Sequence, residues 1–467
     1  MNVRSVSSRG TLVAAALGFV VVLLDVSVVN VALDALLRRF GIDVADLQWV
    51  INGYTLVFAA LLLTSGALGD RFGPRKVFLC GLALFTVASV GCGVAQHFAV
   101  LVGARLVQGL GAALLVPNSL TMLQRAFPNP EQRSRAVGWW GAIGGMAFAA
   151  GPVVGGALVT HFGWRSIFLI NLPIGLVCLC LTLRYVQADG IGHRRSLDWP
   201  GQLSAMLSLA ALTATLAEVG RLGWDSPWVI AGWALTVIFV AAFVSIERRA
   251  SSPMLPLGMF SAPPFAIASI CGVIVNFAYY GLVFVFSLYF QIEQHFSPQQ
   301  TGFAFLPMTV VLALVNVLAG RLVSRLGARR LMVVGLVAAA LGYLLLMPVQ
   351  VHGAYGWLVI PMLLAASGIA LIVPTLVNVT LSSVDASRAG IASGVLNAAR
   401  QVGGLLGVAV FGYFVRDTGS RAFMFGMHVS IGLAVAMLLM GAMLCGLRLD
   451  SQRRARDAAR EEPSVAG

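Results

Sequence analysis

Residues 66–76 read Gly-Ala-Leu-Gly-Asp-Arg-Phe-Gly-Pro-Arg-Lys, and this short charged link decides how the rest of the chain folds. It joins two apolar runs, 49–68 and 77–95, and neither run contains a charged residue. A helix needs about 20 apolar residues to cross the roughly 30 Å hydrocarbon core of a bilayer, so each run is long enough to span a membrane. The sequence therefore predicts a membrane hairpin. Its turn is expected at Gly73-Pro74, because glycine permits a sharp turn and proline suits the first turn of a helix.

The other residues of the link have local roles in this hairpin. We expect Gly66 and Gly69 to let neighbouring helices approach closely, because small residues are typical of helix contacts in membranes. Asp70 is suited to interact with the N-terminus of a helix, where the helix dipole favours an anion. The basic residues of the link are Arg71, Arg75 and Lys76. Basic residues are enriched in cytoplasmic loops, so the link is expected on the cytoplasmic side.

The composition describes a membrane protein. The chain has 467 residues, of which 59% are hydrophobic and only 10% are charged. A soluble protein of this length would need more charged surface than that. The net charge of +13 does not indicate nucleic-acid binding, because the arginines sit in pairs between apolar runs. The cysteines lie in or beside apolar runs and the histidines are scattered, without ligand spacing. We therefore expect no cofactor, no metal ion and no nucleic-acid partner.

Fourteen apolar runs are candidate membrane spans. They fall at about 11–33, 48–68, 77–96, 99–123, 136–160, 166–186, 199–219, 228–246, 265–290, 299–322, 331–349, 357–381, 390–414 and 423–446. An even number of spans places both termini on one side of the membrane. Segments on that side hold 23 Lys and Arg, and the loops on the other side hold 6. This asymmetry predicts that both termini are cytoplasmic.

An internal repeat divides the chain into two halves. Residues 320–330 repeat the pattern of 66–76, with Gly327 in the place of Gly73 and Ser324 in the place of Asp70. Repeated halves are known in transporter folds. We predict an all-α membrane protein with these parts: a cytoplasmic N-terminus 1–10, a six-helix half 11–186, a linker with two extra spans 187–264, a second six-helix half 265–446 and a cytoplasmic tail 447–467.

Two charged residues, Asp25 and Arg105, lie deep inside predicted spans. At 1.5 Å per residue, Asp25 lies about 12 Å and Arg105 about 9 Å below the outer surface, so they share a depth. A charge there costs about 2.5–3.5 kcal/mol on insertion scales and usually serves a function. We predict that Asp25 couples transport to protons and that Arg105 stabilises its ionised form. The alternatives are a purely structural Asp25 held by a neighbouring helix, and an Arg105 that bonds only backbone carbonyls.

Several motifs resemble those of one transporter superfamily. The link 66–76 resembles the loop between spans two and three of the major facilitator superfamily. Arg105-Leu-Val-Gln108-Gly-Leu-Gly-Ala-Ala resembles the span-four motif of its proton-coupled members. The run 151–156, with Gly151, Pro152, Gly155 and Gly156, resembles the antiporter motif of its exporters. The segments 164–175 and 397–404 are similar to the fourteen-span drug:proton antiporter family of the EmrB/QacA type.

The resemblance implies a proton-driven antiporter that exports lipophilic drugs or toxic small molecules across the bacterial cytoplasmic (inner) membrane. Its partners would be protons, membrane lipids and a small lipophilic substrate; a periplasmic adaptor protein, used by some relatives, is left open. The family's conformational latch maps to Gly66, Gly69, Asp70, Arg71, Gly73, Arg75 and Lys76, with Asp70 meeting the cytoplasmic start of span thirteen. The alternative function is a dedicated exporter of one endogenous metabolite or antibiotic. A membrane enzyme or receptor would need a polar catalytic cluster or a soluble domain, and the sequence shows neither.

The substrate cavity is the least defined part of the prediction. Candidate lining residues are Asn30, Gln108, Asn171, Asn276, Tyr280 and Arg400, and for Tyr280 and Arg400 the alternative is helix packing. We also expect Asn30 and Ser27 to make hydrogen bonds between helices. Span 299–322 contains no acidic residue, which argues against multiply charged cations as substrates. Glu218 and Glu293 lie near span ends, where we expect water to reach them.

Overall fold

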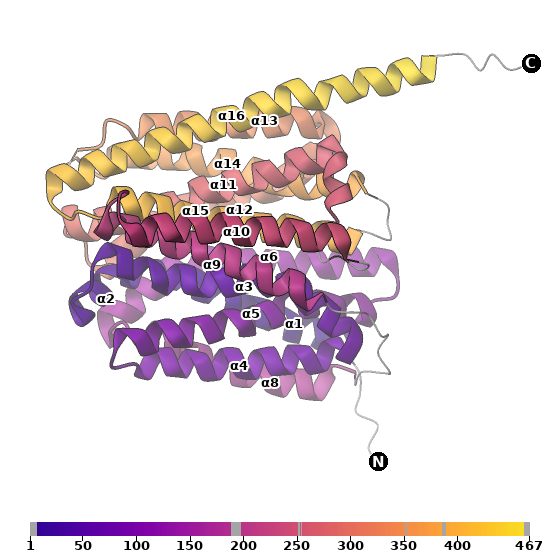
Figure 1. Ribbon diagram of the computed structural model, residues 1–467. Coiled ribbons are helices and arrows are strands. Elements are labelled where there is room, and N and C mark those ends of the chain that lie inside the picture. Colours follow the sequence, from indigo (N-terminus) through magenta and orange to yellow (C-terminus); the bar gives the residue numbers. More distant parts are fainter. Residues whose placement is uncertain are drawn as a thin grey trace, which may run out of the picture.

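The computed structural model describes residues 7–187, 198–250, 253, 255–350, 353–384 and 389–461. Within these ranges the chain forms a bundle of helices, and 14 of them are long and apolar enough to cross a membrane. The first helix begins at Ser8 and the last helix ends at Glu461 on the same side of the bundle (Figure 1), which we call the near end; the opposite side is the far end. The prediction of an all-α membrane protein with fourteen spans is confirmed.

The helices fall into three groups along the chain. The N-terminal half contains α1 (Ser8–Val28), α2 (Leu33–Phe40), α3 (Val44–Phe72), α4 (Pro74–Val94), α5 (Phe98–Ala126), α6 (Pro130–Phe162), α7 (Ser166–Leu169) and α8 (Asn171–Tyr185). The inserted pair is α9 (Trp199–Leu222) and α10 (Pro227–Arg249). The C-terminal half contains α11 (Pro263–Leu288), α12 (Pro298–Leu326), α13 (Ala328–Leu345), α14 (Gly356–Ser382), α15 (Ala389–Phe414) and α16 (Ser420–Glu461).

The first and the last membrane span each extend further than the sequence predicted. The first span does not stop at residue 33, because a 3-10 turn at Val29–Ala32 joins α1 to α2. It ends at Gly41, whose φ of 62° closes the helix in the left-handed conformation that glycine adopts readily. At the other terminus, α16 continues as a helix through Glu461, so the tail predicted from residue 447 starts as a continuation of the last span.

The two copies of the charged link have the same backbone form. Gly73 separates α3 from α4 with a φ of 96°, and Gly327 separates α12 from α13 with a φ of 79°. Pro74 begins α4, as the sequence predicts. A Cβ atom at Gly69 would overlap the Asn118 side chain, so α3 and α5 do approach closely there. The same expectation for Gly66 is wrong, because nothing lies within 4 Å of a Cβ atom at that position.

The halves meet along two seams, α3 with α15 and α6 with α12. The two seams pair equivalent helices of the repeat, the second span of one half with the fifth of the other. At the far end a Cβ atom at Gly156 would lie 2.5 Å from the Pro298 carbonyl oxygen. One at Gly302 would overlap the carbonyl of Pro152. Glycine therefore lets the backbones of α6 and α12 touch at the far end.

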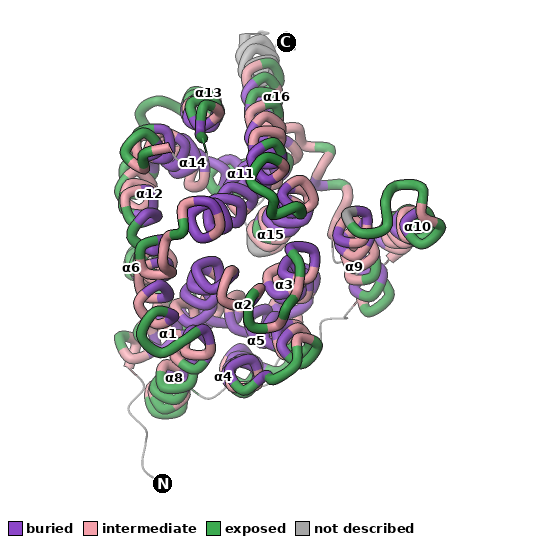
Figure 2. The backbone as a smooth tube through the Cα atoms, turned by 90° about the vertical axis from the view of Figure 1, so that its left-hand side faces the viewer, coloured by how far each residue is buried: buried purple, intermediate pink, exposed green. Residues whose placement is uncertain are grey.

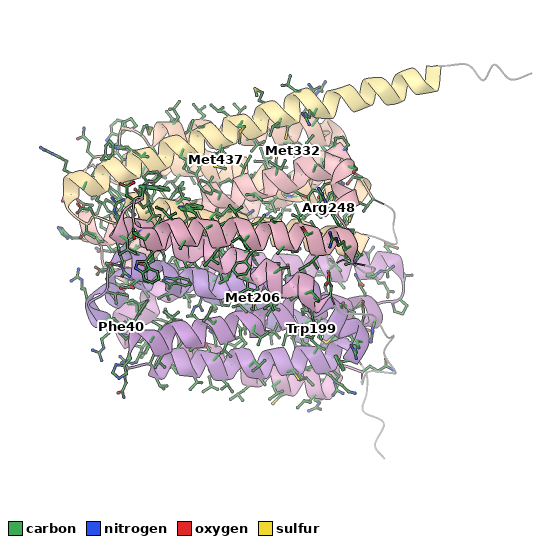
Figure 3. The ribbon with its side chains drawn as sticks, viewed as in Figure 1. Phe40, Trp199, Met206, Arg248, Met332 and Met437 are labelled. Atoms are coloured by element: carbon green, nitrogen blue, oxygen red, sulfur yellow. The ribbon has the colours of Figure 1, made fainter. Side chains whose placement is uncertain are left out.

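The inserted helices α9 and α10 lie outside the two bundles, beside the α3–α15 seam (Figure 2). Trp199 at the start of α9 and Arg248 near the end of α10 are at the near end, whereas Phe40 is at the far end (Figure 3). Toward the near end, the Gln202 amide donates to the Ala60 carbonyl over 2.6 Å and its oxygen accepts from the Thr64 hydroxyl. The pair is thus attached to α3 by polar bonds as well as by apolar packing.

A second attachment lies at the far end of α9. Arg221 contacts Asp43 over 2.8 Å and Asp46 over 2.6 Å, at the start of α3. In the turn after α9, the Trp224 indole N–H donates to the Tyr413 hydroxyl of α15 over 3.1 Å. Partial burial works to raise the pKa of Asp43, but the hydrogen bond and charge of Arg221 outweigh it and lower that pKa below its ordinary value of 3.8. The inserted pair therefore touches both halves.

The glycine contact at the far end predicts the effect of one added methyl group. Gly302→Ala should lower the melting temperature of the purified protein, because forcing atoms into a close backbone contact costs about 1–3 kcal/mol. The matched control is Gly320→Ala in the same helix, where nothing lies within 4 Å of the added atom. The control should be neutral or slightly stabilising, since alanine favours a helix over glycine. Equal melting temperatures for the two variants would contradict the close contact.

The Arg221 cluster predicts a pH-dependent stability difference. A carboxyl group whose folded-state pKa is lowered stabilises the fold above its unfolded pKa and loses that effect as pH falls through its folded pKa. Arg221→Gln should therefore lower the melting temperature slightly and equally at pH 7 and pH 5, by the about 0–1 kcal/mol typical of exposed pairs. The difference should shrink only below about pH 3.8. Arg421→Gln, which removes an exposed arginine at the same end, is the control and should show no such pH dependence.

Candidate functional site

Asp25 and Arg105, predicted to share a depth, meet inside the N-terminal half. Asp25 and Arg105 are 0% and 1% exposed, so the pair is buried. An Arg105 Nη1 donates to Asp25 Oδ2 over 2.5 Å, which makes a buried ion pair between α5 and α1. Removing one partner of a buried pair typically costs about 3–5 kcal/mol, because the other charge is left uncompensated. The pair therefore holds α1 and α5 in one relative position.

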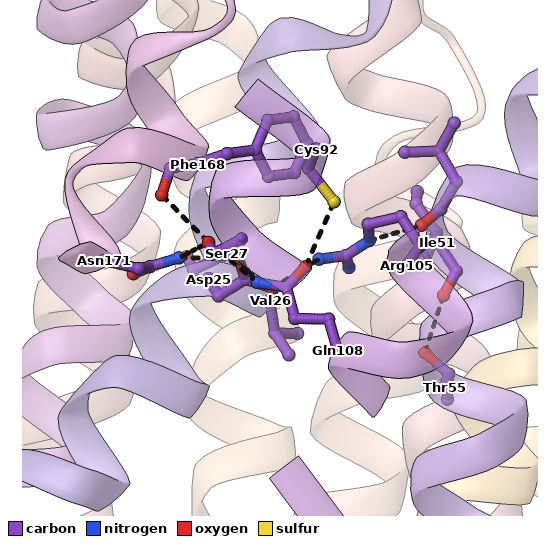
Figure 4. A network of polar contacts seen from close by, with 12 residues as sticks. Asp25, Val26, Ser27, Ile51, Thr55, Cys92, Arg105, Gln108, Phe168 and Asn171 are labelled. Atoms are coloured by element: carbon purple, nitrogen blue, oxygen red, sulfur yellow. Dashed lines mark hydrogen bonds and ion pairs between the residues drawn. The ribbon is translucent and has the colours of Figure 1, made fainter. Parts of the chain in front are cut away.

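Two amide side chains complete the coordination of the carboxylate. The Gln108 amide donates to Asp25 Oδ1 over 2.7 Å, and the Asn171 amide donates to the same oxygen over 3.0 Å (Figure 4). Arg105 and Gln108 stand three residues apart on α5, so they lie on the same face of that helix. Asn171 is the first residue of α8. Hydrogen bonds to charged groups are about twice as strong as neutral ones, and the three donors hold the Asp25 side chain from two helices, α5 and α8.

Arg105 is itself fixed by three neighbours. Its Nε donates to the Val50 carbonyl of α3 over 2.9 Å, and its guanidinium lies 4.4 Å from the centre of the Tyr54 ring. Its Nη1 also donates to the Gln108 side-chain oxygen over 2.8 Å. The sequence predicts that Arg105 either stabilises Asp25 or bonds only backbone carbonyls. Its side chain does both, because it binds the Asp25 carboxylate and the Val50 carbonyl. Cation–π contact in a desolvated site adds about 2 kcal/mol.

Ser89 and Tyr54 belong to the site although the sequence analysis did not select them. The Ser89 hydroxyl of α4 accepts from Gln108 over 3.1 Å and from Asn171 over 2.9 Å, and it donates to the Phe168 carbonyl over 2.9 Å. It therefore connects the two amides that hold Asp25. A single serine or tyrosine in an apolar run carries no distinctive signal, since serine commonly bonds within its own helix. Only the packing of α3 and α4 against α5, which in turn packs against α1, identifies them.

A small cavity lies between the halves, next to this network. Its volume is about 10 Å³, which is about the space that one water molecule needs. It is lined from α1 by Ser27 and Asn30, from α6 by Phe148 and Pro152, and from the C-terminal half by Tyr279, Tyr280, Val283, Phe305, Met308 and Thr309. The lining is mainly aromatic and apolar, as in sites for lipophilic ligands.

The structure divides the six predicted cavity residues into separate groups. Asn30 and Tyr280 line the cavity, but Gln108 and Asn171 are fully buried around Asp25 and belong to the ion-pair network. Asn276 donates to the Gly272 carbonyl of its own helix over 3.0 Å.

Of the two interhelical hydrogen bonds expected of Ser27 and Asn30, the structure contains one. The Ser27 hydroxyl does bond a neighbouring helix, at the Phe148 carbonyl of α6. The Asn30 amide instead donates to Val26 and Ser27 carbonyls of its own chain segment, so the interhelical bond predicted for its side chain is wrong. The reason is local, because an asparagine can reach the carbonyl one turn earlier.

The run 151–156 in α6 packs against both neighbours of that helix. A Cβ atom at Gly151 would overlap Ser27, and one at Gly155 would lie 3.0 Å from the Val28 carbonyl, so both glycines face α1. Gly156 faces α12, as described above. Pro152 lies inside the helix and lines the cavity. The motif is therefore a close-packed seam between α1, α6 and the C-terminal half.

The link 66–76 lies at the near end. Arg75 donates to the Leu183 carbonyl of α8 over 3.1 Å, and Arg71 lies 5.2 Å from the ring of Phe72. The expected meeting of Asp70 with the start of the thirteenth span concerns residues 385–388, which lie outside the described residues. The link is thus anchored to the N-terminal half through Arg75.

Glu293 differs from the expectation that water reaches it. It ends a π-helical turn, Tyr289–Glu293, that continues α11, and it is buried, with its Oε1 making no hydrogen bond among the described residues. Glu218 fits the expectation, since it lies 3.5 Å from Arg221 and is partly exposed. No group of three or more His, Cys, Asp or Glu residues within the described ranges is placed to hold a metal ion.

The chain resembles known transporters in both sequence and structure. It is 38% identical over 404 residues to "Multidrug resistance protein Stp" of Mycobacterium tuberculosis, covering 86% of this chain and 75% of that protein. It is 36% identical over 415 residues to "Methylenomycin A resistance protein" of Streptomyces coelicolor, covering 89% of this chain and 87% of that protein. A bacterial homologue of the human lysosomal transporter Spinster, in an inward-facing and unoccupied conformation, superposes with a TM-score of 0.68 at 17% identity, covering 94% of this chain and 96% of that one.

The fold, the repeated halves and these relatives agree with a match between residues 15–408 and the family model described as Major Facilitator Superfamily. That model covers most of the chain, including the ion-pair site and both copies of the charged link. The chain belongs to the major facilitator superfamily of secondary transporters.

Proposed function

We propose that this chain is a proton-coupled antiporter that exports lipophilic small molecules from the cytoplasm across the bacterial inner membrane. The near end would face the cytoplasm, because the segments there hold most of the Lys and Arg outside the spans. The observation that carries the proposal is Asp25, a carboxylate deep in the membrane that three donor side chains hold away from solvent. Curated relatives named as drug and antibiotic resistance proteins support the export of such compounds.

The hydrogen bonds around Asp25 suggest how a proton alters the structure. Protonation removes the negative charge to which Arg105, Gln108 and Asn171 donate hydrogen bonds, so the ion pair loses its electrostatic attraction. α1 is then released from α5 and α8. Since Asp25 and Ser27 lie on the same helix, movement of α1 also moves the wall of the cavity and the Ser27 bond to α6. Proton binding and substrate binding would thus act on one helix.

The two seams provide the moving surfaces for this cycle. The far-end contacts of Gly156 and Gly302 close the side away from the cytoplasm, and substrate release would require them to separate. Rocking of two repeat-related halves about a central site is the established motion of such folds. These glycines make van der Waals contacts with backbone carbonyls, and the Gln299 N–H donates to the Thr160 hydroxyl beside them, so separation breaks one hydrogen bond but no ion pair of the described residues.

A dedicated exporter of one antibiotic is the second candidate. The names of the relatives support it as much as they support a multidrug pump. "Methylenomycin A resistance protein" names a single compound, whereas "Multidrug resistance protein Stp" names many. Cells that express this chain separate the two in a growth test against a chemically diverse panel. Resistance to one compound class alone supports the dedicated exporter, and resistance across classes supports the multidrug pump.

The coupling role of Asp25 can be tested by one isosteric change. In proteoliposomes with an imposed pH gradient, Asp25→Asn should reduce substrate accumulation to the level of empty vesicles, because asparagine cannot exchange a proton. Glu218→Gln, which alters a partly exposed acid near a span end, should accumulate substrate like the wild type. Gradient-driven accumulation that persists in Asp25→Asn would remove this residue from the mechanism.

The ion pair itself can be tested by a double-mutant cycle on the melting temperature. Arg105→Gln and Asp25→Asn should each destabilise the protein, the first by about 3–5 kcal/mol, because each leaves one buried charge without its partner. The double variant holds no buried charge at this site and should recover part of the loss. If the two losses simply add, the residues do not interact in the way that the structure shows.

A further inference from the structure

Arg400 lies in the middle of α15 and is a deep cation without a counter-charge. Its Nε is buried and makes no hydrogen bond, and no ion pair joins it to another described residue. The residue as a whole is only partly buried. Its stem packs beside Gly272, where a Cβ atom would lie 3.2 Å from Arg400 Cγ. An unpaired charge at this depth costs several kcal/mol and usually marks a functional site.

The acids of the chain do not supply the missing partner. Asp25, the only acid in the middle of a span, is already neutralised by Arg105 in the other half. The spans of the C-terminal half, from α11 to residue 446, contain no Asp or Glu between their ends. The interior between the halves therefore has a net positive charge even when Asp25 is ionised. A molecule that enters it can supply the negative group that the protein lacks.

The position of Arg400 connects it to the cavity. Gly404 lies one helical turn after Arg400 on α15, and a Cβ atom there would lie 2.9 Å from the ring of Tyr280, which lines the cavity together with Tyr279 and Phe148. The rings of Phe148 and Tyr280 are 6.5 Å apart across the two halves. An apolar body placed against these rings would have its polar end within reach of the guanidinium. Arginine is suited to this task, because its fork of N–H donors matches the oxygens of a carboxylate or a sulfonate.

We propose that Arg400 is a specificity-determining residue that binds the anionic group of amphipathic substrates, namely compounds with an aromatic or apolar body and one carboxylate or sulfonate. This inference rests on the proposed export function and names the substrate class. The aromatic side chains beside the cavity hold the body of the molecule and Arg400 holds its charge. Multiply charged cations are disfavoured, because Arg400 repels them and no second deep acid attracts them.

The test compares two ligands that differ only in the anionic group. Anilinonaphthalene sulfonate carries a sulfonate, and phenylnaphthylamine is the same ring system without it. Binding of each is measured by equilibrium dialysis against the protein in phosphatidylcholine nanodiscs, with empty nanodiscs subtracted. The zwitterionic lipid excludes an anionic headgroup as the bound species. No gradient is present, so the result does not depend on proton coupling, which the proteoliposome assay tests separately.

The wild type should bind the sulfonate more tightly than the uncharged compound. Arg400→Gln should weaken sulfonate binding about tenfold, the loss expected for one charge-assisted hydrogen bond, and leave phenylnaphthylamine binding unchanged. Arg400→Lys keeps the charge and should retain part of the preference. Arg9→Gln removes an exposed arginine at the near end and should change neither affinity.

Stability separates this role from helix packing. Removing an uncompensated buried charge should leave the melting temperature of Arg400→Gln equal to or above that of the wild type. A packing arginine would instead lower it. The proposal is wrong if the wild type shows no preference for the sulfonate, or if Arg400→Gln retains that preference.

Discussion

The buried ion pair between Asp25 and Arg105 determines how the helices of the N-terminal half are arranged. Two opposite charges in hydrocarbon are tolerated only when each finds its partner and its remaining hydrogen bonds are satisfied. Here Gln108, Asn171 and the Val50 carbonyl meet those needs. Helices α1, α3, α5 and α8 must therefore converge on one point. In the proposed mechanism, one proton on the carboxylate would remove the reason for their convergence.

The rest of the interior combines weak contacts with unbalanced charge. The far-end seam between α6 and α12 depends on glycines at which the backbones touch, and one hydrogen bond, from the Gln299 N–H to the Thr160 hydroxyl over 3.2 Å, accompanies these contacts. The Asp25 network and the cavity share α1, because Asp25 and the cavity residue Ser27 lie two residues apart. In the C-terminal half, Arg400 has no acid to balance it. The two halves thus differ in electrostatics although they repeat one fold.

The inserted helices α9 and α10 add contacts that the two halves do not require for closure. They lie beside the α3–α15 seam, and the far end of α9 reaches Asp43 of one half while the adjoining turn reaches Tyr413 of the other. Most of α10 faces outward with large apolar side chains, which suits contact with lipid. Attachments of this kind fix the insertion to the moving halves through surface bonds that are individually weak.

The sequence by itself determined the fourteen spans, the repeat and the depth of Asp25 and Arg105, because apolar length, turn residues and helical rise are local properties. It also predicted the turn at Gly73. It did not determine which side chains surround the ion pair, since Ser89 and Tyr54 join the network only when α3 and α4 pack against α5. Nor did it show that Gly66 faces open space, that Asn30 bonds its own segment, or that Glu293 is buried. Those outcomes depend on helix rotation and on contacts between distant segments, which the tertiary structure alone decides.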